Sequence, residues 1–478
     1  MLKKLFLCLL LAVPLLATAQ EDIYDPSAQY EYPTDPLVRK KLDQWQDLKF
    51  GVILHWGVYA QASIPESWPI CGEPWPKRDT TMSYEAYKKW YWDLANQFNP
   101  VKFNPEKWAE TSKNAGMKYI VFTTKHHDGF NMFDTKQSDY KITSGPFKNN
   151  PKADVTKYIF DAYRKKGMMI GAYFSKPDWH SPYFWWDRQP TANRNVNYNT
   201  TQFSERWQKF KDFTYNQISE LVHNYGNIDV LWFDGGWVRS PKKGELEKPL
   251  ATDIRGRAPY PAYSQDVDMN RIVKMARTAQ PGILVADRTI HGPNENFKTP
   301  EQSIPKMQMK EPWETCITLT KSWSYRKEEK AKSSTWVIHS LAEVVAKGGN
   351  MLLGFGPTPE GEFPKEVEKP LAEVGEWLKL NGKAIYGTRI TENYNDGNTW
   401  FTQSKDGKTK YAIVCIKEGE SVPASVQWKG NQPTKNGTIK LVATAKNVNW
   451  KKEGNEIIVE IPKNLVGKNT EALVFTLN

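Results

Sequence analysis

The feature that most restricts the fold of this chain is a unit repeated through its first three-quarters. Each unit is a short apolar run typical of a buried strand, followed by an amphipathic stretch typical of a helix. The expected strands are residues 50–55, 119–124, 168–175, 228–233, 283–286, 315–319 and 351–355. The expected helices are residues 105–115, 153–166, 203–224, 266–279, 335–347 and 365–380. This alternation predicts parallel βαβ units, which close most economically into an α/β fold, a TIM-like barrel of the (β/α)8 type.

The pattern changes after residue 382. Four β-rich runs follow, separated by Gly, Asn, Lys and Pro turns and without a helical stretch between them: residues 411–416, 437–443, 456–461 and 472–477. We therefore expect a barrel domain over residues 21–382 and a C-terminal antiparallel β-sandwich over residues 383–478. Because no low-complexity linker separates the two parts, we expect them to pack together, with the sandwich capping the barrel.

Residues 1–20 have the pattern of a secretory signal peptide. Lys3 and Lys4 precede an apolar run at 5–16, and residues 17–19 offer a small-residue cleavage site. The run is too short to span a membrane, and no later stretch reaches about 18 uninterrupted apolar residues. The sequence thus predicts an exported protein, secreted or periplasmic, with no transmembrane segment.

Charge and cysteine content exclude two classes of protein. The formal net charge is +11, and removal of residues 1–20, which hold two lysines and no acids, leaves +9. The basic residues are scattered among acids and form no base-reading motif, so we expect no nucleic-acid partner. The remaining cysteines, Cys71, Cys316 and Cys415, show no CxxC spacing. A disulfide-rich scaffold is therefore excluded.

Unusual polar residues stand at the expected carboxyl ends of five successive strands. In a parallel barrel these ends form the face that carries function. Two of the chain's seven histidines, His126 and His127, directly follow a buried strand. The other four strand ends carry His55, Tyr173 with Ser175, Asp234, and Asp287 with Arg288. Together they predict a polar site at one mouth of the barrel.

Asp234 is the sharpest candidate for a catalytic residue. The run at 228–233 is almost continuously apolar, and two glycines follow Asp234, so its carboxylate stands at the tip of a strand with little steric cover. Such a carboxylate can attack a carbon centre, provided that a second carboxyl group acts first as acid and then as base. The simpler alternative is an aspartate that caps the next helix.

Six motifs resemble, in order, those of the α-L-fucosidases of glycoside hydrolase family 29. They are FGVILHWG (50–57), KYIVFTTKHHDGF (118–130), GAYFS (171–175), LWFDG (231–235), WETC (313–316) and GGNMLL (348–353). The resemblance runs from about residue 48 into the C-terminal sandwich. It implies a retaining exo-glycosidase that releases terminal α-linked L-fucose from fucosylated glycans through a covalent glycosyl-enzyme intermediate, without a cofactor.

The resemblance also implies roles for individual residues. Asp234, the aspartate of LWFDG, matches the family nucleophile. Glu66 and Trp68 match a Glu-Trp pair that contacts the fucose hydroxyls, although Ser67 separates the two here and many members have them adjacent. The remaining positions that bind the sugar in the family are matched by His55, His126, His127, Tyr173, Trp232 and Arg288.

The acid/base is expected in the loop after Arg288. The Thr-Pro-Glu segment that ends at Glu301 resembles the one that supplies it in many bacterial members, so Glu301 is the first candidate. Glu295 is second, because related sequences can use an acid a few residues earlier, and Glu314 is third. The two carboxyl groups of a retaining enzyme stand about 5–5.5 Å apart, so proximity to Asp234 discriminates among the three.

Two other functions fit parts of the pattern. A metal-dependent hydrolase would use His55, His126, His127 and Asp234 as ligands. Because neighbouring histidines on a strand project to opposite faces and no HxH or HExxH spacing occurs, we expect no metal. A non-catalytic fucose-binding protein would keep the sugar site but would have no need of a nucleophile. The sequence leaves open the fucosyl linkage, the oligomeric state and whether the C-terminal domain binds sugar.

Overall fold

The computed structural model describes residues 30–73, 75–191, 193–241, 263–434 and 437–478. The expected signal peptide, residues 1–20, lies outside the described residues. Within them, no helix is both long and apolar enough to cross a membrane.

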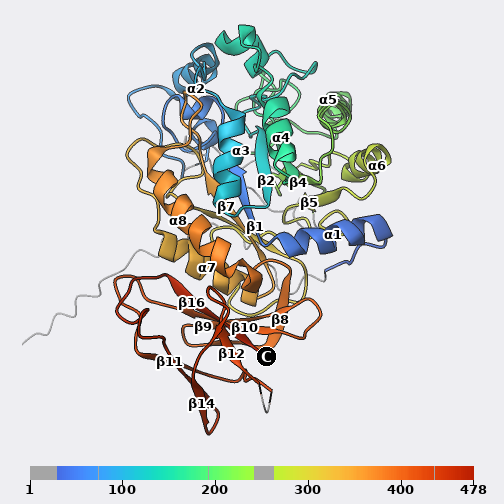
Figure 1. Ribbon diagram of the computed structural model, residues 1–478. Coiled ribbons are helices and arrows are strands. Elements are labelled where there is room, and N and C mark those ends of the chain that lie inside the picture. Colours follow the sequence, from blue (N-terminus) through green and yellow to red (C-terminus); the bar gives the residue numbers. More distant parts are fainter. Residues whose placement is uncertain (1–29, 74, 192, 242–262, 435–436) are drawn as a thin grey trace, which may run out of the picture.

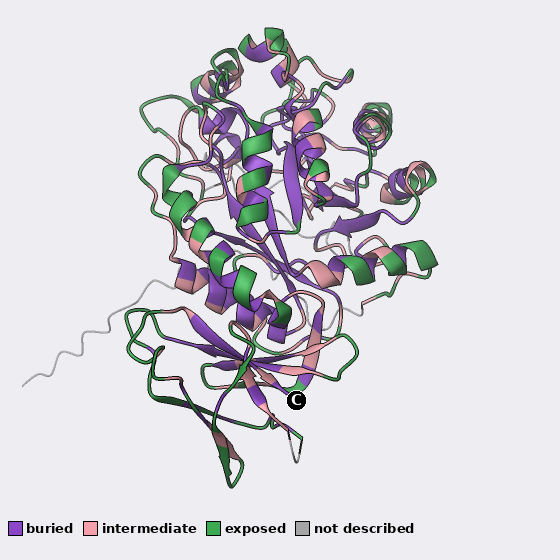
Figure 2. Ribbon diagram, in the orientation of Figure 1, coloured by how far each residue is buried: buried purple, intermediate pink, exposed green. Residues whose placement is uncertain are grey.

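Seven parallel strands form a curled sheet at the centre of the barrel part (Figure 1). Along the sheet they follow the order β5-β4-β3-β2-β1-β7-β6. Each strand lies within two residues of its expected position. Their bounds are β1 Phe50–Leu54, β2 Tyr119–Lys125, β3 Met169–Ser175, β4 Val230–Asp234, β5 Leu284–Asp287, β6 Glu314–Thr318 and β7 Asn350–Phe355. The strands are almost wholly buried, as continuous apolar runs in a parallel sheet require (Figure 2).

The barrel closes through an irregular segment at 294–302 instead of an eighth regular strand. On one side the segment bonds to β5, where the Asn296 N–H donates to the Val285 carbonyl at 2.8 Å. On the other side it bonds to β6, where the Glu314 N–H donates to the Lys298 carbonyl at 2.8 Å. The expected TIM-like barrel is therefore present, and the segment that carries Glu301 completes its wall.

Helix α1 (Pro36–Leu48), which the sequence pattern did not predict, closes the bottom of the barrel. Its buried residues Val38, Leu42 and Trp45 recur at helical spacing and join the cluster of side chains that fills the barrel interior. Trp45 stacks on Phe297 of the closing segment with ring centroids 4.1 Å apart. The barrel is thus a packed core, and its polar mouth is at the other end.

The expected helices all form, and α2 (Tyr84–Asp93) is a further one. They are α3 Pro105–Asn114, α4 Val155–Lys165, α5 Ser204–Asn224, α6 Met269–Ala279, α7 Ser334–Ala346 and α8 Lys365–Asn381. The expected start of α6 at residue 266 is wrong by three residues. Asp268 is the N-cap, and its side chain accepts a hydrogen bond from the Arg271 N–H, so the helix begins after it.

The C-terminal part is an antiparallel β-sandwich, as expected, and its described residues form nine strands where the sequence indicated four. One sheet holds β8 Thr388–Asp396, β9 Thr399–Ser404, β10 Lys410–Cys415, β12 Ile439–Leu441, β13 Lys446–Asn447 and β16 Ala472–Leu477. The other holds β11 Ser425–Lys429, β14 Trp450–Glu453 and β15 Glu456–Glu460. The outer face of the larger sheet packs on α7, which is mostly buried (Figure 2). The boundary at 382/383 stays a prediction.

Candidate active site

Asp234, the last residue of β4, is the centre of the polar group at the barrel mouth. Tyr173 Oη donates a hydrogen bond to Asp234 Oδ2 at 2.7 Å, and the Gly235 N–H donates to Oδ1 at 2.8 Å. His127 Nε2 lies 3.7 Å from Oδ2. These contacts follow from the parallel register, which sets the ends of β3 and β4 side by side with Ser175 opposite Asp234.

One guanidinium joins Asp234 to Glu301. Arg288 Nη1 lies 2.9 Å from Asp234 Oδ1, and its Nη2 lies 2.7 Å from Glu301 Oε2. Trp323 Nε1 donates to the other Glu301 oxygen at 3.2 Å, and Thr299 Oγ1 accepts from Arg288 Nε at 3.2 Å. The side chains of Asp234 and Glu301 are 20% and 25% exposed, whereas that of Arg288 is 6% exposed. Both carboxyl groups can therefore be reached from solvent.

The surroundings of Asp234 favour its ionised form. Burial by itself would raise the pKa of this carboxyl, but the Arg288 guanidinium and the hydrogen bonds from Tyr173 and the Gly235 amide together hold the pKa well below its usual value. Asp234 is thus a carboxylate throughout the ordinary pH range, which is the state that a nucleophile requires.

Three histidines line the same mouth in neutral form. Burial lowers the pKa of His55 and of His126 well below the usual value, and burial with the nearby Arg194 charge lowers that of His127 to about 3. Serine hydroxyls hold two of the rings: Ser67 Oγ lies 2.6 Å from His126 Nδ1, and Ser175 Oγ contacts His127 Nδ1. Neutral imidazoles can both donate to and accept from hydroxyl groups.

The expected Glu-Trp pair and its inserted serine make three different sets of contacts: those of Glu66, Ser67 and Trp68. Glu66 accepts a hydrogen bond from the Ser324 N–H at 2.8 Å, and burial raises its pKa to about 7. Ser67 is wholly buried against His126, and Trp68 contacts the His127 ring at a centroid distance of 5.0 Å. The inserted serine therefore orients a histidine while its two neighbours remain at the mouth.

A sequence model of the α-L-fucosidase family matches residues 17–383, which is more than three-quarters of the chain. The chain belongs to the α-L-fucosidase family. Its members are glycoside hydrolases, and the curled barrel with a C-terminal β-domain is the fold that it shares with them.

Individual members of the family are similar along most of the chain. The plasma α-L-fucosidase of Homo sapiens is 29% identical over 457 residues, covering 91% of this chain and 89% of the relative. Isoenzyme 1 of Paenibacillus thiaminolyticus superposes with a TM-score of 0.70 at 29% identity, covering 92% and 99% of the two chains. The Thermotoga maritima α-fucosidase in complex with fucose gives a TM-score of 0.70 at 26% identity, covering 94% and 100%.

Among the family-derived candidates, the other two glutamates lie in different surroundings from Glu301. The Glu314 carboxylate points into the barrel core, where Tyr119 Oη and Trp232 Nε1 donate to it at 2.5 and 3.1 Å, and it is 0% exposed. Trp232 itself packs against Tyr173 and under Arg288, so it supports the site from below.

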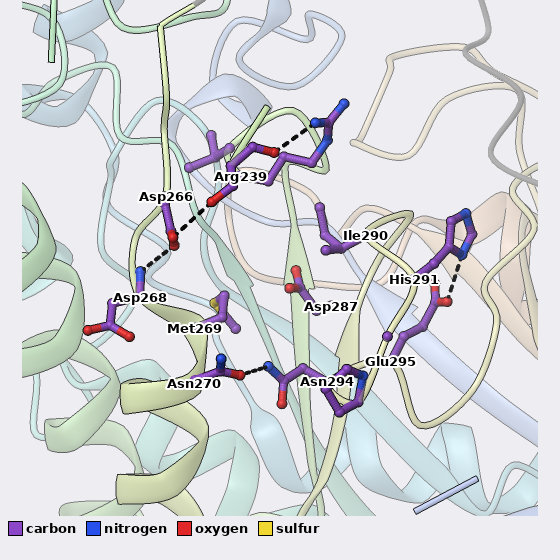
Figure 3. A pocket seen from close by; sticks show the side chains of 14 residues that line it. Arg239, Asp266, Asp268, Met269, Asn270, Asp287, Ile290, His291, Asn294 and Glu295 are labelled. Carbon is purple, nitrogen blue, oxygen red and sulfur yellow. Dashed lines mark hydrogen bonds and ion pairs between the residues drawn. The ribbon is translucent and has the colours of Figure 1, made fainter. Parts of the chain in front are cut away.

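Glu295 faces a separate pocket of about 290 Å³ beside α6 (Figure 3). There it accepts from the Thr289 N–H at 3.2 Å and pairs with His291 Nδ1 at 3.0 Å. Asp287 lines the same pocket, and Asp234 does not. The charge network that contains Asp234 therefore reaches Glu301 and neither of the alternatives.

Three aromatic or cationic residues near the mouth were not expected from the sequence. The Trp323 ring lies tilted beside His55, with centroids 5.1 Å apart, and Arg194 lies 5.0 Å from the rings of both Trp68 and Trp237. Trp237 could have been noticed because it follows the Asp-Gly-Gly turn of β4. Trp323 and Arg194 stand in long loops, and no local pattern marks them.

The expectation that the adjacent histidines diverge is wrong. Strand β2 ends at Lys125, so His126 and His127 lie in the turn beyond it, and their rings are 4.2 Å apart. Ligand atoms of His126, His127 and Asp234 all lie within 4.8 Å of one another, a spacing that could hold a metal ion. However, Arg288 and Tyr173 already occupy the Asp234 oxygens, and a guanidinium at 2.9 Å disfavours a second cation.

Proposed function

We propose that this chain is a retaining exo-α-L-fucosidase that releases terminal L-fucose from fucosylated oligosaccharides or glycoconjugates, with Asp234 as nucleophile and Glu301 as acid/base. The observation that carries the proposal is the guanidinium of Arg288, which binds Asp234 on one side and Glu301 on the other. A single guanidinium between two carboxyl groups supports the short separation typical of retaining enzymes, about 5–5.5 Å. Family membership supplies the reaction class.

In the first step, Asp234 attacks the anomeric carbon while Glu301 gives its proton to the glycosidic oxygen. The bond from the anomeric carbon to that oxygen breaks, and an ester forms between the sugar and Asp234. In the second step, Glu301 takes a proton from a water molecule, whose oxygen attacks the anomeric carbon and breaks the ester. Two inversions return the original anomeric configuration.

The groups around Asp234 suit a sugar ring. His55 Nδ1 is buried and has no hydrogen-bond partner among the described residues, so it offers a position for a sugar hydroxyl. His55 stands beside Trp323 and Tyr173, at centroid distances of 5.1 and 5.2 Å. These aromatic faces can pack against the apolar side of fucose, including its methyl group. Glu66 and Trp68 border the same mouth.

Hydrolysis of an aryl α-L-fucoside tests the proposal. The Asp234→Ala variant is expected to lose turnover by about 10⁴-fold or more, because no nucleophile remains, and to bind L-fucose still. Asp406→Ala, in an exposed hairpin of the sandwich, is the matched control and is expected to keep full activity.

The anomer released first gives a second test. By NMR, the first fucose released by the unchanged enzyme is expected to be the α-anomer. Full turnover by Asp234→Ala, or initial release of the β-anomer, would refute the mechanism. Fucose binding without any hydrolysis would instead indicate a non-catalytic binding protein.

We also propose that the protein is exported after removal of residues 1–20. The basic start, the apolar run and the small-residue site support this. The mature N-terminus, determined on protein recovered from outside the cytoplasm, is expected to be Glu21. Recovery of the uncleaved chain from the cytoplasm would contradict export.

A further inference from the structure

A large groove lies where α7 of the barrel meets the C-terminal sandwich. Its volume is about 820 Å³, and its walls come from α7, from β9 to β11 and from the loops that join them. None of the residues at the barrel mouth lines it. Cavities of about 300–1,000 Å³ at the junction of two domains are frequent ligand sites in proteins.

Two half-buried tryptophans stand in the walls of the groove. Trp336 comes from α7 and Trp400 from β9. A lysine ammonium lies over each ring, Lys332 at 4.1 Å from the Trp336 centroid and Lys347 at 5.5 Å from that of Trp400. Neither lysine lines the groove, so each indole is held in place and keeps a surface toward it. Flat indole surfaces are suited to the C–H faces of sugar rings.

Fixed hydrogen-bond acceptors accompany the tryptophans. The N–H of His339 Nε2 donates to the Glu471 carbonyl at 2.8 Å, so in the neutral ring Nδ1 is the acceptor. Asn398 Nδ2 donates to the Cys415 carbonyl at 2.7 Å, which leaves the amide oxygen as the acceptor end. The carboxylate of Glu343 is held by Lys347 at 2.6 Å. Each of these three side chains lines the groove, and acceptors of this kind bind hydroxyl groups.

The acidic residues of the groove are largely balanced by lysines. Glu343, Glu418 and Glu420 line it together with Lys417. Lys347 pairs with Glu343 at 2.6 Å, and Lys417 pairs with Glu420 at 3.5 Å. The groove therefore has no concentration of one charge sign to attract a charged ligand, and aromatic platforms with hydroxyl acceptors describe a site for an uncharged polyhydroxyl chain.

We propose that the groove between α7 and the C-terminal sandwich is a second carbohydrate-binding site, which holds a neutral oligosaccharide apart from the catalytic residues. Such a site would keep the enzyme on the carbohydrate that surrounds its substrate. Binding there does not depend on the reaction at Asp234.

Affinity electrophoresis on the full-length mature protein tests this inference. The gels contain galactoxyloglucan, galactomannan or polymer-linked lacto-N-neotetraose, which are neutral and carry no fucose, with saturating free L-fucose to fill the barrel mouth. We expect retardation by at least one of them. Trp336→Ala and Trp400→Ala should each weaken it about tenfold or more, as truncated aromatic anchors do. Trp336→Phe should keep most of the binding, and Trp90→Ala, a half-buried tryptophan outside the groove, should not change it.

The same four variants are also assayed for hydrolysis of an aryl α-L-fucoside, and all four are expected to keep the activity of the unchanged protein. Retained hydrolysis shows that each variant is folded and that the groove is separate from the catalytic residues. Retardation by none of the three carbohydrates would overturn the inference. So would equal retardation of the two alanine variants and the unchanged protein, or stronger retardation by a sulfated fucan than by every neutral carbohydrate. A protein that is retarded but does not cleave the fucoside would refute the proposed function and leave the groove assignment intact.

Discussion

At the residue scale, the site is organised by one positive charge, that of Arg288, which two carboxyl groups share. Arg288 is bound to Asp234, to Glu301 and to Thr299, so one buried cation fixes both carboxyl groups. The neutral histidines around it add hydrogen-bonding capacity without adding charge. Asp234 and Glu301 share this cation but differ in their other partners, which are Tyr173 and the Gly235 amide for Asp234 and Trp323 for Glu301.

The Glu301→Gln and Glu295→Gln variants distinguish the two loop candidates for the acid/base. Because Gln cannot transfer the proton, Glu301→Gln is expected to lower kcat on a poor leaving group by about 10²–10⁴-fold and to affect an activated aryl fucoside much less. Glu295→Gln should change both rates little, since its carboxylate lines another pocket. Steady-state kinetics on the two substrates measures this. The reverse pattern would assign the role to Glu295.

Glu314 gives a prediction about stability and pH. Burial raises its pKa from 4.5 to about 7. Between these values the folded protein keeps a proton that the unfolded chain has released, so the stability due to this group is complete below about pH 4.5 and is lost as pH rises through about 7. The loss is on the order of 3 kcal/mol.

The Glu314→Gln variant should therefore lose less stability than the unchanged protein between pH 5 and pH 8. Denaturant unfolding at both values measures the difference. We also expect the variant to keep most of its turnover, because the carboxylate faces Tyr119 and Trp232 inside the barrel. An unaltered pH dependence of stability would show that Glu314 is ionised in the folded protein.

At the element scale, the ends of the strands decide which side chains reach the mouth. Lys125 is the last residue of β2, and it turns outward to Asp178 and Phe174, whereas His126 and His127 turn inward. At the end of β4 the chain turns through Gly235, whose φ is +88°. A Cβ at this position would lie 2.4 Å from Pro177 Cδ, so glycine is required by both conformation and space.

The Gly235→Ala variant should therefore displace Asp234. We expect a loss of about 1–3 kcal/mol in stability and a fall in kcat of about tenfold to 10²-fold. Gly397→Ala is the matched control: this hairpin glycine also has positive φ, at +58°, but a Cβ there meets nothing within 4 Å. The control should lose about 1 kcal/mol and keep its activity. Thermal unfolding and kinetics compare the two, and equal activity in both variants would contradict the role given to this turn.

At the scale of the whole molecule, barrel and sandwich share one core. Ile413 and Val474, on the larger C-terminal sheet, belong to the same buried cluster as the helices and outer strand faces of the barrel. Helix α7 lies between the two parts and contacts β7, β8 and β9 (Figure 1). A helix that is apolar on most sides is stable only when both sides are covered.

We therefore expect the mature chain to unfold in one calorimetric transition. Ile413→Ala should lower its midpoint, because truncation of a buried isoleucine costs about 2–5 kcal/mol, and should leave the transition single. Two separate peaks, with only one shifted by the substitution, would show that the sandwich unfolds independently.

The sequence by itself determined the seven strands of the barrel, the helices α3 to α8 and the polar residues at the strand ends. Runs such as Tyr119 to Phe122 specify a buried strand through their own composition, and parallel strands bring their carboxyl ends together whatever the loops do. For this reason the strand pattern alone is enough to place His55, His127 and Asp234 near one another.

Only the tertiary structure decided which glutamate stands beside Asp234. Arg288 and Trp323 hydrogen-bond to Glu301 at the barrel mouth. Tyr119, 195 residues away in the sequence, hydrogen-bonds to Glu314 inside the barrel core. The closing segment at 294–302 likewise has no clear sequence pattern, because its backbone takes its path only from the hydrogen bonds that it makes to β5 and β6. Contacts between residues far apart in the chain have no local signature, and the chemistry of a carboxyl group depends on those contacts.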